Sequence, residues 1–210
     1  MGAVLGLLTL VIAGLVFFVV PPAEGLGDYV RIAFFHIPVA WVAVIAFLVS
    51  AVQGGRYLHS GEMLADAKSA AAAQLGFLFV ILATVSGAIF SKLTWGAYWN
   101  WDPRQTTIFV LLLIYGAYLT LRGAMPAGPR RAKTAAVYAL FSFLTVPFLV
   151  FILPRLYFSL HPSPVINGTG LAMDSLMLAV LLAALLDITG IFYWLWQRQT
   201  QKLMQKGDRE

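Results

Sequence analysis

The residues with the clearest chemical potential in this 210-residue chain form one short aromatic run. Residues 95–104 read Trp-Gly-Ala-Tyr-Trp-Asn-Trp-Asp-Pro-Arg and contain three of the six tryptophans. Indole and phenol rings are amphipathic and settle where hydrocarbon meets lipid headgroups. Their broad faces also suit a large planar ligand whose edge carries charge. The run therefore predicts either a membrane-interface belt or a platform for a planar ligand.

Two of the three histidines are expected on the same side of a membrane as this run. His36 lies near the outer end of an apolar stretch and His161 lies in a later outer loop, whereas His59 falls on the opposite side. Imidazole is the commonest metal ligand among side chains, and two of them can fill both axial positions of a haem iron. Either histidine alone is more simply an interfacial side chain bonded to backbone or headgroups. The pair beside the tryptophan run favours a haem site.

Three further features of the run concern charge and local structure. Asp102-Pro103 is typical of the N-cap and first position of a helix. Arg104 then lies at the positive end of that helix dipole, which is unfavourable for a cation unless an anion is near. That anion is either Asp102 or a ligand carboxylate such as a haem propionate. If the run itself is helical, Trp95, Tyr98, Trp99 and Asp102 share one stripe.

The composition indicates an integral membrane protein. Hydrophobic residues make up 60% of the chain, charged residues 11%, and the mean hydropathy is +0.84, which is more apolar surface than a water-soluble core of this size could bury. Six stretches approach the roughly 20 apolar residues that a helical crossing needs. They are residues 4–20, 32–52, 69–91, 105–121, 134–153 and 171–196. They are too long and too uniform for barrel strands. We therefore expect an all-α membrane protein with six transmembrane helices in a single domain, residues 1–210.

The Lys and Arg residues predict the orientation, because excess positive charge stays cytoplasmic. Four of the fourteen fall in the loops after the first, third and fifth stretches, at Arg31, Lys92, Arg104 and Arg155. The other ten fall in the alternate loops and the C-terminal tail. Both termini are therefore expected in the cytoplasm, with outer loops at about 21–31, 92–104 and 154–170. The net charge of +5 is then a topology signal and gives no reason to expect nucleic acid as a partner.

Two absences and one buried carboxylate bear on function. Without cysteine the chain has no C-x-x-C-H motif, so any haem would be held without thioether bonds. Without a G-x-x-x-x-G-K-[ST] loop it cannot hydrolyse ATP by that route, and a partner would have to supply energy. Asp187 lies inside the last apolar stretch, where a carboxylate either bonds a neighbouring helix or handles protons or ligand.

Residues 95–104 resemble the tryptophan-rich "WWD" signature of membrane haem-handling proteins in cytochrome c biogenesis. The chain length, the six expected helices and the run His36-Ile37-Pro38-Val39-Ala40-Trp41 resemble the CcmC branch of that CcmC, CcmF and CcsA family. The related CcsA-type and CcmF-type proteins are longer. The ending Asp-Pro-Arg-Gln is closer to the CcsA-like form than to the Asp-Ala-Arg-Leu form common in the CcmC branch.

The resemblance implies a protein of the bacterial inner membrane that is not an enzyme. It would bind haem b transiently and non-covalently at the periplasmic face and deliver it to the haem chaperone CcmE, together with CcmA, CcmB and CcmD. Two outer-loop histidines are the axial ligands in that family, and the WWD loop shapes the haem platform. By motif, the iron ligands here are His36 and His161. The platform is carried over onto Trp95, Trp99, Trp101, Asp102 and Arg104.

Three alternatives remain open at this point. A CcsA-like haem channel or lyase component would share the tryptophan signature. A respiratory haem b subunit would hold its haem permanently between histidines deep in facing helices. In a haem-free structural subunit of an ABC transporter, the tryptophans would form only a membrane belt.

Overall fold

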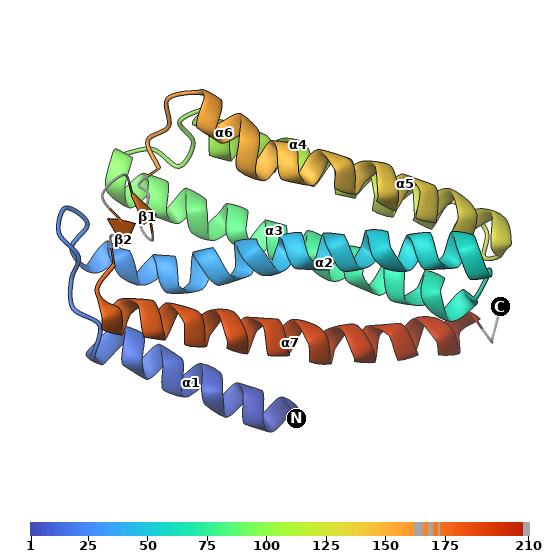
Figure 1. Ribbon diagram of the computed structural model, residues 1–210, viewed down its shortest axis with the longest axis horizontal. Coiled ribbons are helices and arrows are strands. Elements are labelled where there is room, and N and C mark those ends of the chain that lie inside the picture. The colour runs from blue at the N-terminus through green and yellow to red at the C-terminus, as the bar shows by residue number, and fades with distance from the viewer. Residues whose placement is uncertain (162–165, 168–169, 172, 208–210) are drawn as a thin grey trace.

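The computed structural model is an elongated helical bundle and describes residues 1–161, 166–167, 170–171 and 173–207 (Figure 1). Its seven α-helices are α1 (Gly2–Phe18), α2 (Ala33–Ser60), α3 (Met63–Trp95), α4 (Pro103–Ala124), α5 (Pro129–Pro147), α6 (Leu153–Leu156) and α7 (Ser175–Gly207). A 3-10 turn, η1 (Asp28–Ile32), leads into α2, and a π-helical turn, η2 (Phe148–Ile152), joins α5 to α6. Two short strands, β1 (Ile166–Asn167) and β2 (Gly170–Leu171), pair antiparallel before α7.

Five of these helical segments are long and apolar enough to cross a membrane. They are Asp28–Ser60, Met63–Trp95, Pro103–Ala124, Pro129–Leu156 and Ser175–Gln205. The N-terminal helix α1 is apolar but shorter, with 17 residues, and about 25 Å of helix nearly matches a hydrocarbon core of about 30 Å. The prediction of an all-α membrane protein with six apolar helices is confirmed.

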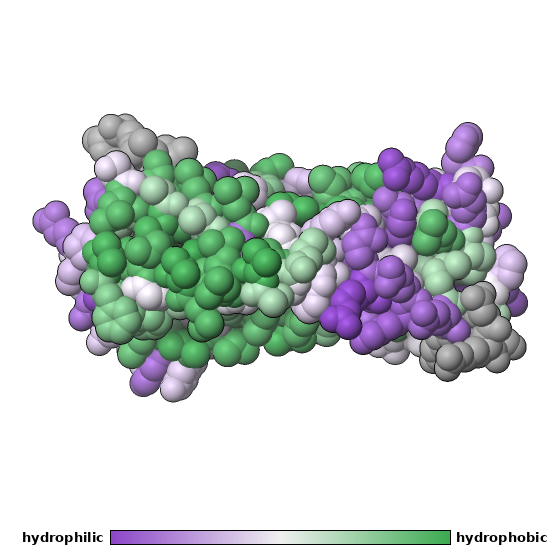
Figure 2. Space-filling model, turned by 90° about the horizontal axis from the view of Figure 1, so that it is seen from below, coloured by the Kyte–Doolittle hydropathy of each residue, from purple (hydrophilic) through white to green (hydrophobic). Residues whose placement is uncertain are grey.

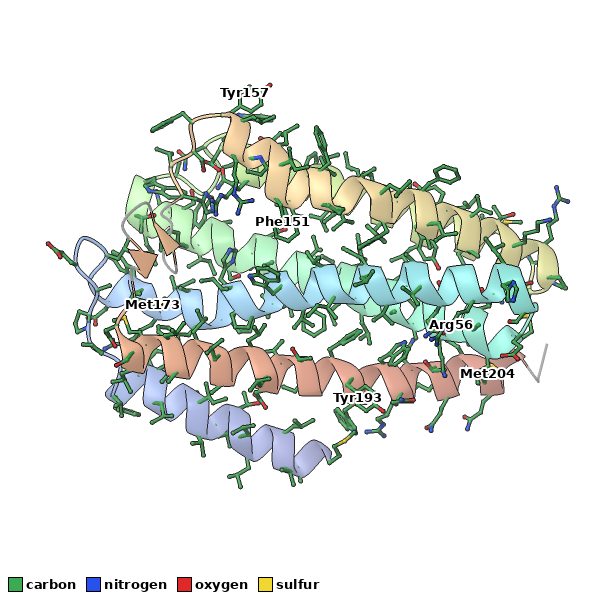
Figure 3. All side chains as sticks on the ribbon, viewed as in Figure 1. Arg56, Phe151, Tyr157, Met173, Tyr193 and Met204 are labelled. Carbon is green, nitrogen blue, oxygen red and sulfur yellow. The ribbon has the colours of Figure 1, made fainter. Side chains whose placement is uncertain are left out.

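The two ends of the bundle differ in chemistry. We call the end with η1, residues 96–102 and residues 157–161 the loop end, and the opposite end, with the α2–α3 and α4–α5 turns, the turn end (Figure 1). Met173 and Tyr157 lie at the loop end, whereas Arg56 and Met204 lie near the turn end (Figure 3). On the face shown in Figure 2, hydrophobic residues cover the loop-end half and hydrophilic residues gather toward the turn end. That division is expected of a bundle embedded in lipid over only part of its length.

The centre of the bundle is a close packing of α2 against α3. The alanines at 70, 71, 72 and 73 are fully buried, so this part of α3 presents little side-chain bulk to its neighbours. A Cβ atom at Gly76 would lie only 2.6 Å from Cε1 of Phe47, so glycine is required for this approach. The Phe47 ring in turn stacks on Tyr115 of α4, with centroids 3.4 Å apart. Small residues in α3 thus allow the helices to approach as membrane helices commonly do.

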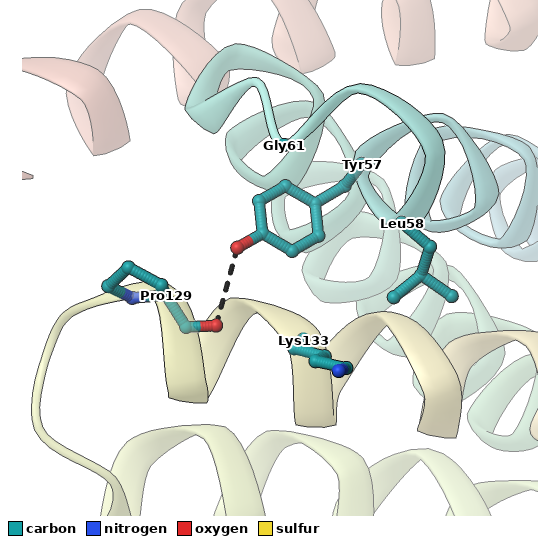
Figure 4. Close-up of a pocket in the computed structure, with 5 residues that line it drawn as sticks. All are labelled: Tyr57, Leu58, Gly61, Pro129 and Lys133. Carbon is teal, nitrogen blue, oxygen red and sulfur yellow. Dashed lines mark hydrogen bonds between the residues drawn. The ribbon is translucent and has the colours of Figure 1, made fainter.

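The turn end is held by polar contacts that the sequence analysis did not anticipate. Arg122 donates two hydrogen bonds to the buried carboxylate of Asp66, at 2.7 and 2.6 Å, which ties α4 to α3. Beside them the Tyr57 hydroxyl donates to the Pro129 carbonyl at 3.3 Å. That bond borders a small cavity of about 220 Å³ between the end of α2 and the start of α5 (Figure 4). These contacts tie α2 to α5 and α3 to α4 at the turn end.

The peripheral helix α1 is joined to α7 through Asp187. The Thr9 hydroxyl lies 2.7 Å from Oδ2 of Asp187 and 3.0 Å from the Leu5 carbonyl. Asp187 is only 2% exposed, and its Oδ1 atom has no hydrogen-bond partner among the described residues. Of the two interpretations of Asp187, the structure supports a hydrogen bond to a neighbouring helix.

We expect Thr9→Val to weaken the attachment of α1. Valine has a similar shape but no hydroxyl, so Oδ2 of the buried Asp187 carboxylate would lose its partner and neither oxygen would then be bonded, at a cost of about 1–3 kcal/mol. The free energy of unfolding in detergent, measured with denaturant, checks this. Thr120→Val is the matched control, because its hydroxyl bonds only the Gly116 carbonyl on the exposed part of α4. Equal losses in the two variants would show that the Thr9–Asp187 contact contributes nothing.

Candidate functional site

The tryptophan run is not helical beyond Trp95. Helix α3 ends there because Gly96 adopts a left-handed conformation, with φ at 83°, and its N–H bonds the Lys92 carbonyl. The loop is therefore residues 96–102, within the expected range of about 92–104. Because these residues are not helical, the stripe that a helical run would have formed is absent. The indoles separate instead, because Trp99 packs edge-on against Trp101 whereas Trp95 packs against Phe90.

Hydrogen bonds from both flanking helices fix the loop. The Asn100 side chain donates to the Ser91 hydroxyl of α3 at 2.7 Å, and that hydroxyl donates to the Ala97 carbonyl at 2.7 Å. The Gln105 side chain of α4 accepts from the Asn100 backbone N–H at 2.8 Å. Trp101 has a positive φ of 56°, which is strained for an aromatic residue. A strained residue persists where its surroundings over-determine it, so the loop is held rigidly.

Asp102 is the central polar residue of the site. Its carboxylate accepts from the Arg104 backbone N–H at 2.9 Å, so the predicted N-cap of α4 is confirmed. The same carboxylate accepts from the Leu160 N–H at 2.7 Å, the Ser159 hydroxyl at 2.9 Å and Nδ1 of His161 at 3.1 Å. Asp102 is only 4% exposed. One carboxylate thus joins the start of α4 to a segment nearly 60 positions later in the chain.

The electrostatics fix the state of this pair. Burial acts to raise the pKa of Asp102, but hydrogen bonds from the Arg104 and Leu160 amides and the Ser159 hydroxyl outweigh it and hold the pKa below its usual value. Burial lowers the pKa of His161, and the Asp102 charge only partly offsets this. Near neutral pH the pair is therefore a carboxylate and a neutral imidazole. Nδ1 of His161 carries the hydrogen that it donates to Asp102, which leaves the Nε2 lone pair free for a metal.

His36 is placed in the first turn of α2, at the loop end. Its Nδ1 lies 3.0 Å from the Ser86 hydroxyl oxygen of α3. A Cβ atom at Gly87 would lie 3.0 Å from Cε1 of this ring, so glycine allows the imidazole to pack directly against α3. The two predicted iron ligands both lie at the loop end, His36 in the first turn of α2 and His161 in a loop beside Trp95, the last residue of α3.

The remaining predicted residues divide into two groups. Trp95 lies against His161, with ring centroids 5.1 Å apart and an edge-on geometry. Trp99 packs on Phe109 of α4, and Trp101 is 77% exposed, so these two indoles form the outer part of the loop. The structure thus brings Trp95 to the histidine, whereas Trp99 and Trp101 contact each other.

Among the residues that the structure describes, the Arg104 guanidinium lies within ion-pair distance of no carboxylate. Asp102, which accepts the Arg104 backbone N–H, is the nearest protein anion, and Arg155 lies in α6. A guanidinium without a direct carboxylate contact suits an anionic ligand group. Arg155, Ser86 and Ser159 are residues that the sequence analysis did not select, because nothing in their spacing distinguishes them.

The donor set fits a haem better than a bare metal ion. The described residues contain no cluster of three or more His, Cys, Asp or Glu side chains that could hold a metal, and His59 is exposed in the last turn of α2. A bare zinc or iron ion takes three or more protein ligands. Haem iron already has four porphyrin nitrogens and needs at most two axial ligands. Two imidazoles beside indole rings and unpaired arginines match that requirement.

Comparison with known proteins agrees with this chemistry. The sequence matches the family profile "Heme exporter protein C" over residues 1–210. It is 32% identical over 167 residues to heme exporter protein C of Bradyrhizobium diazoefficiens, an alignment that covers 79% of this chain but 63% of that protein. It is also 32% identical over 130 residues to the Paracoccus denitrificans heme exporter protein C, with 61% of this chain and 54% of that protein covered.

The similarity extends to a neighbouring family over a shorter range. The cytochrome c biogenesis protein CcsA of Parasynechococcus marenigrum is 39% identical over 83 residues, which cover 40% of this chain and 27% of that protein. These relatives are named for heme export and for cytochrome c biogenesis, and the chain spans about 63% of the length of the first and 54% of the second. The chain belongs to the heme exporter protein C family.

Proposed function

We propose that this protein binds haem at the loop end of the bundle, with the iron between Nε2 of His36 and Nε2 of His161. The observation that carries the proposal is the state of the two imidazoles. Each has Nδ1 at an oxygen atom, Ser86 for His36 and Asp102 for His161, so each keeps Nε2 available. Metal-binding histidines in proteins are oriented in this way by a partner on the other ring nitrogen.

The surroundings of the histidines would hold the porphyrin. Trp95 presents an indole beside His161, and Trp99 and Trp101 extend the aromatic surface outward along the loop. Arg104 and Arg155 would pair with the two propionates, since guanidinium groups bind carboxylates with directed hydrogen bonds. Without cysteine the chain cannot attach haem through thioether bonds. The proposed ligand is haem b, held non-covalently, as the resemblance implies.

The site is built for transfer rather than for permanent storage. His161 comes from a loop, and its side chain is 17% exposed, so one iron ligand is near the surface. A respiratory haem b subunit would instead use histidines inside facing helices. We place the loop end at the periplasmic face of the bacterial inner membrane, with both termini cytoplasmic, because ten of fourteen basic residues belong to the opposite side. The receiver is then the chaperone CcmE, and CcmA, CcmB and CcmD are the other partners.

Reconstitution of the purified protein with haem in lipid nanodiscs tests this function. We expect the low-spin spectrum of haem with two imidazole ligands. When the apo form of CcmE is added, we expect the haem to transfer to CcmE and this spectrum to disappear. The haem-free structural subunit would be favoured by the absence of any Soret band. Haem that binds but stays on the protein would favour the CcsA-like or respiratory alternative.

A further inference from the structure

The hydrogen-bond partners of the two histidines are chemically different, and this difference has a functional consequence. The Ser86 oxygen lies 2.8 Å from the Leu82 carbonyl and 3.2 Å from the Ala83 carbonyl, besides 3.0 Å from Nδ1 of His36. Carbonyl oxygens can only accept, so the single hydroxyl hydrogen of Ser86 is directed to the α3 backbone. The oxygen lone pairs of Ser86 then face His36. In this arrangement we assign the donor role to Nδ1 of His36, the tautomer that leaves Nε2 free for a metal.

The hydrogen-bond acceptor of His161 is stronger than that of His36. Asp102 is an ionised carboxylate, and a hydrogen bond to a charged acceptor is about twice as strong as one to a neutral hydroxyl. A stronger acceptor on Nδ1 also makes Nε2 a more basic metal ligand. Ser86 is a neutral hydroxyl, so it offers His36 no negative charge. The two imidazoles thus have the same tautomer but unequal donor strength.

We infer that Ser86 is the positioning residue of His36, and that His36 is the weaker iron ligand and the first to dissociate when haem leaves. This inference rests on the proposed haem site. His161, held by Asp102, then keeps the iron until the receiver takes it. Ser86 acts only through the imidazole and need not touch the haem.

Exogenous ligands can test the partner of each histidine. In His36→Gly, free imidazole can enter the vacated position and donate its N–H to Ser86, whereas 1-methylimidazole cannot donate. We expect imidazole and 4-methylimidazole to restore the low-spin spectrum with an affinity about 3- to 10-fold higher than 1-methylimidazole. The compound 4-methylimidazole controls for the size of the added methyl group. In His36→Gly combined with Ser86→Ala, this preference should disappear.

The same titration on His161→Gly compares the two sides. There the acceptor is a carboxylate, so the preference for imidazole over 1-methylimidazole should be larger, about 10- to 100-fold. Equal preferences in the two glycine variants would overturn the inference that His36 is the weaker iron ligand. A preference in His36→Gly that persists without the Ser86 hydroxyl would overturn the role of Ser86. If the parent protein binds no haem, or if His36→Gly leaves its spectrum unchanged, the proposed site itself is wrong.

The order of dissociation has its own kinetic test. Carbon monoxide binds reduced two-histidine haem only after one imidazole has left, so its binding rate reports the weaker ligand. We expect Ser86→Ala to increase this rate about 3- to 10-fold, and Ser86→Thr, which keeps a hydroxyl, to restore it. An unchanged rate in Ser86→Ala would mean that His161 leaves first. A rate that rises equally in Ser86→Thr would show a packing effect instead of a hydrogen bond.

Discussion

Replacing His161 by alanine is expected to abolish the low-spin spectrum of bound haem and to lower haem affinity by more than about 100-fold. Loss of a residue that hydrogen-bonds a metal ligand typically costs about 10- to 100-fold in metal affinity. Loss of the ligand itself should cost more. His36→Ala should have the same spectral effect, because either substitution leaves the iron with one imidazole. Haem titration with absorption and electron paramagnetic resonance spectra measures both effects.

The matched control is His59→Ala, which removes an exposed imidazole at the turn end and should leave the spectrum unchanged. Circular dichroism and gel filtration would show that each variant keeps the bundle. If His161→Ala or His36→Ala retained a spectrum with two imidazole ligands, that residue would not bind the iron. A loss of spectrum in His59→Ala as well would point to a general loss of structure.

The second large effect is expected for Asp102→Asn. Asparagine is as good an N-cap as aspartate, so α4 should begin at the same residue. The amide nitrogen cannot accept a hydrogen bond, so we expect the lost contact to residues 159–161 to cost about 1–3 kcal/mol of stability. The amide carries no charge, so His161 would lose its anionic acceptor, and we expect haem affinity to fall about 10- to 100-fold. Haem titration at neutral pH measures the loss, and denaturant unfolding of the haem-free protein measures stability.

Asp174 provides the control for Asp102. Its carboxylate accepts from the Met177 backbone N–H at 2.9 Å and so caps the start of α7. Asp174→Asn makes the same chemical change at a capping position where, among the described residues, the carboxylate bonds a backbone N–H and no histidine. We expect unchanged haem affinity there. Equal losses in the two variants would mean that Asp102 acts on haem only through the helix that it caps.

The six apolar helices could be predicted because a bilayer leaves the chain few alternatives. Backbone groups in lipid must bond within their own segment, so long apolar stretches become helices. The helix boundaries at the turn end of the bundle could not be predicted in the same way. Helix α3 begins at Met63 and α7 continues to Gly207, well past the apolar stretches 69–91 and 171–196. These polar extensions are stabilised by contacts between helices, such as the Gln199 to Gln74 hydrogen bond.

The candidate site could be predicted in part from the sequence. Histidines, tryptophans and an Asp-Pro pair are rare enough in such a sequence to attract notice by type and spacing alone. Ser86 gave no such signal, because a serine in a membrane helix usually bonds the backbone of its own preceding turn. Ser159 and Asp102 are 57 positions apart, and only the folded chain shows that they touch. The tryptophans do not form a helical stripe for a local reason, since the single residue Gly96 ends α3 and turns the chain.

The several hydrogen bonds accepted by Asp102 imply that residues 159–161 are held at the start of α4 as one unit. Their hydroxyl, amide and imidazole contacts all converge on one carboxylate, so loosening one of them weakens the hold on the others. In the proposed haem site, haem that had lost His36 would remain attached through His161 of this segment. Because the Arg104 N–H bonds the same carboxylate, release of residues 159–161 would leave the start of α4 capped.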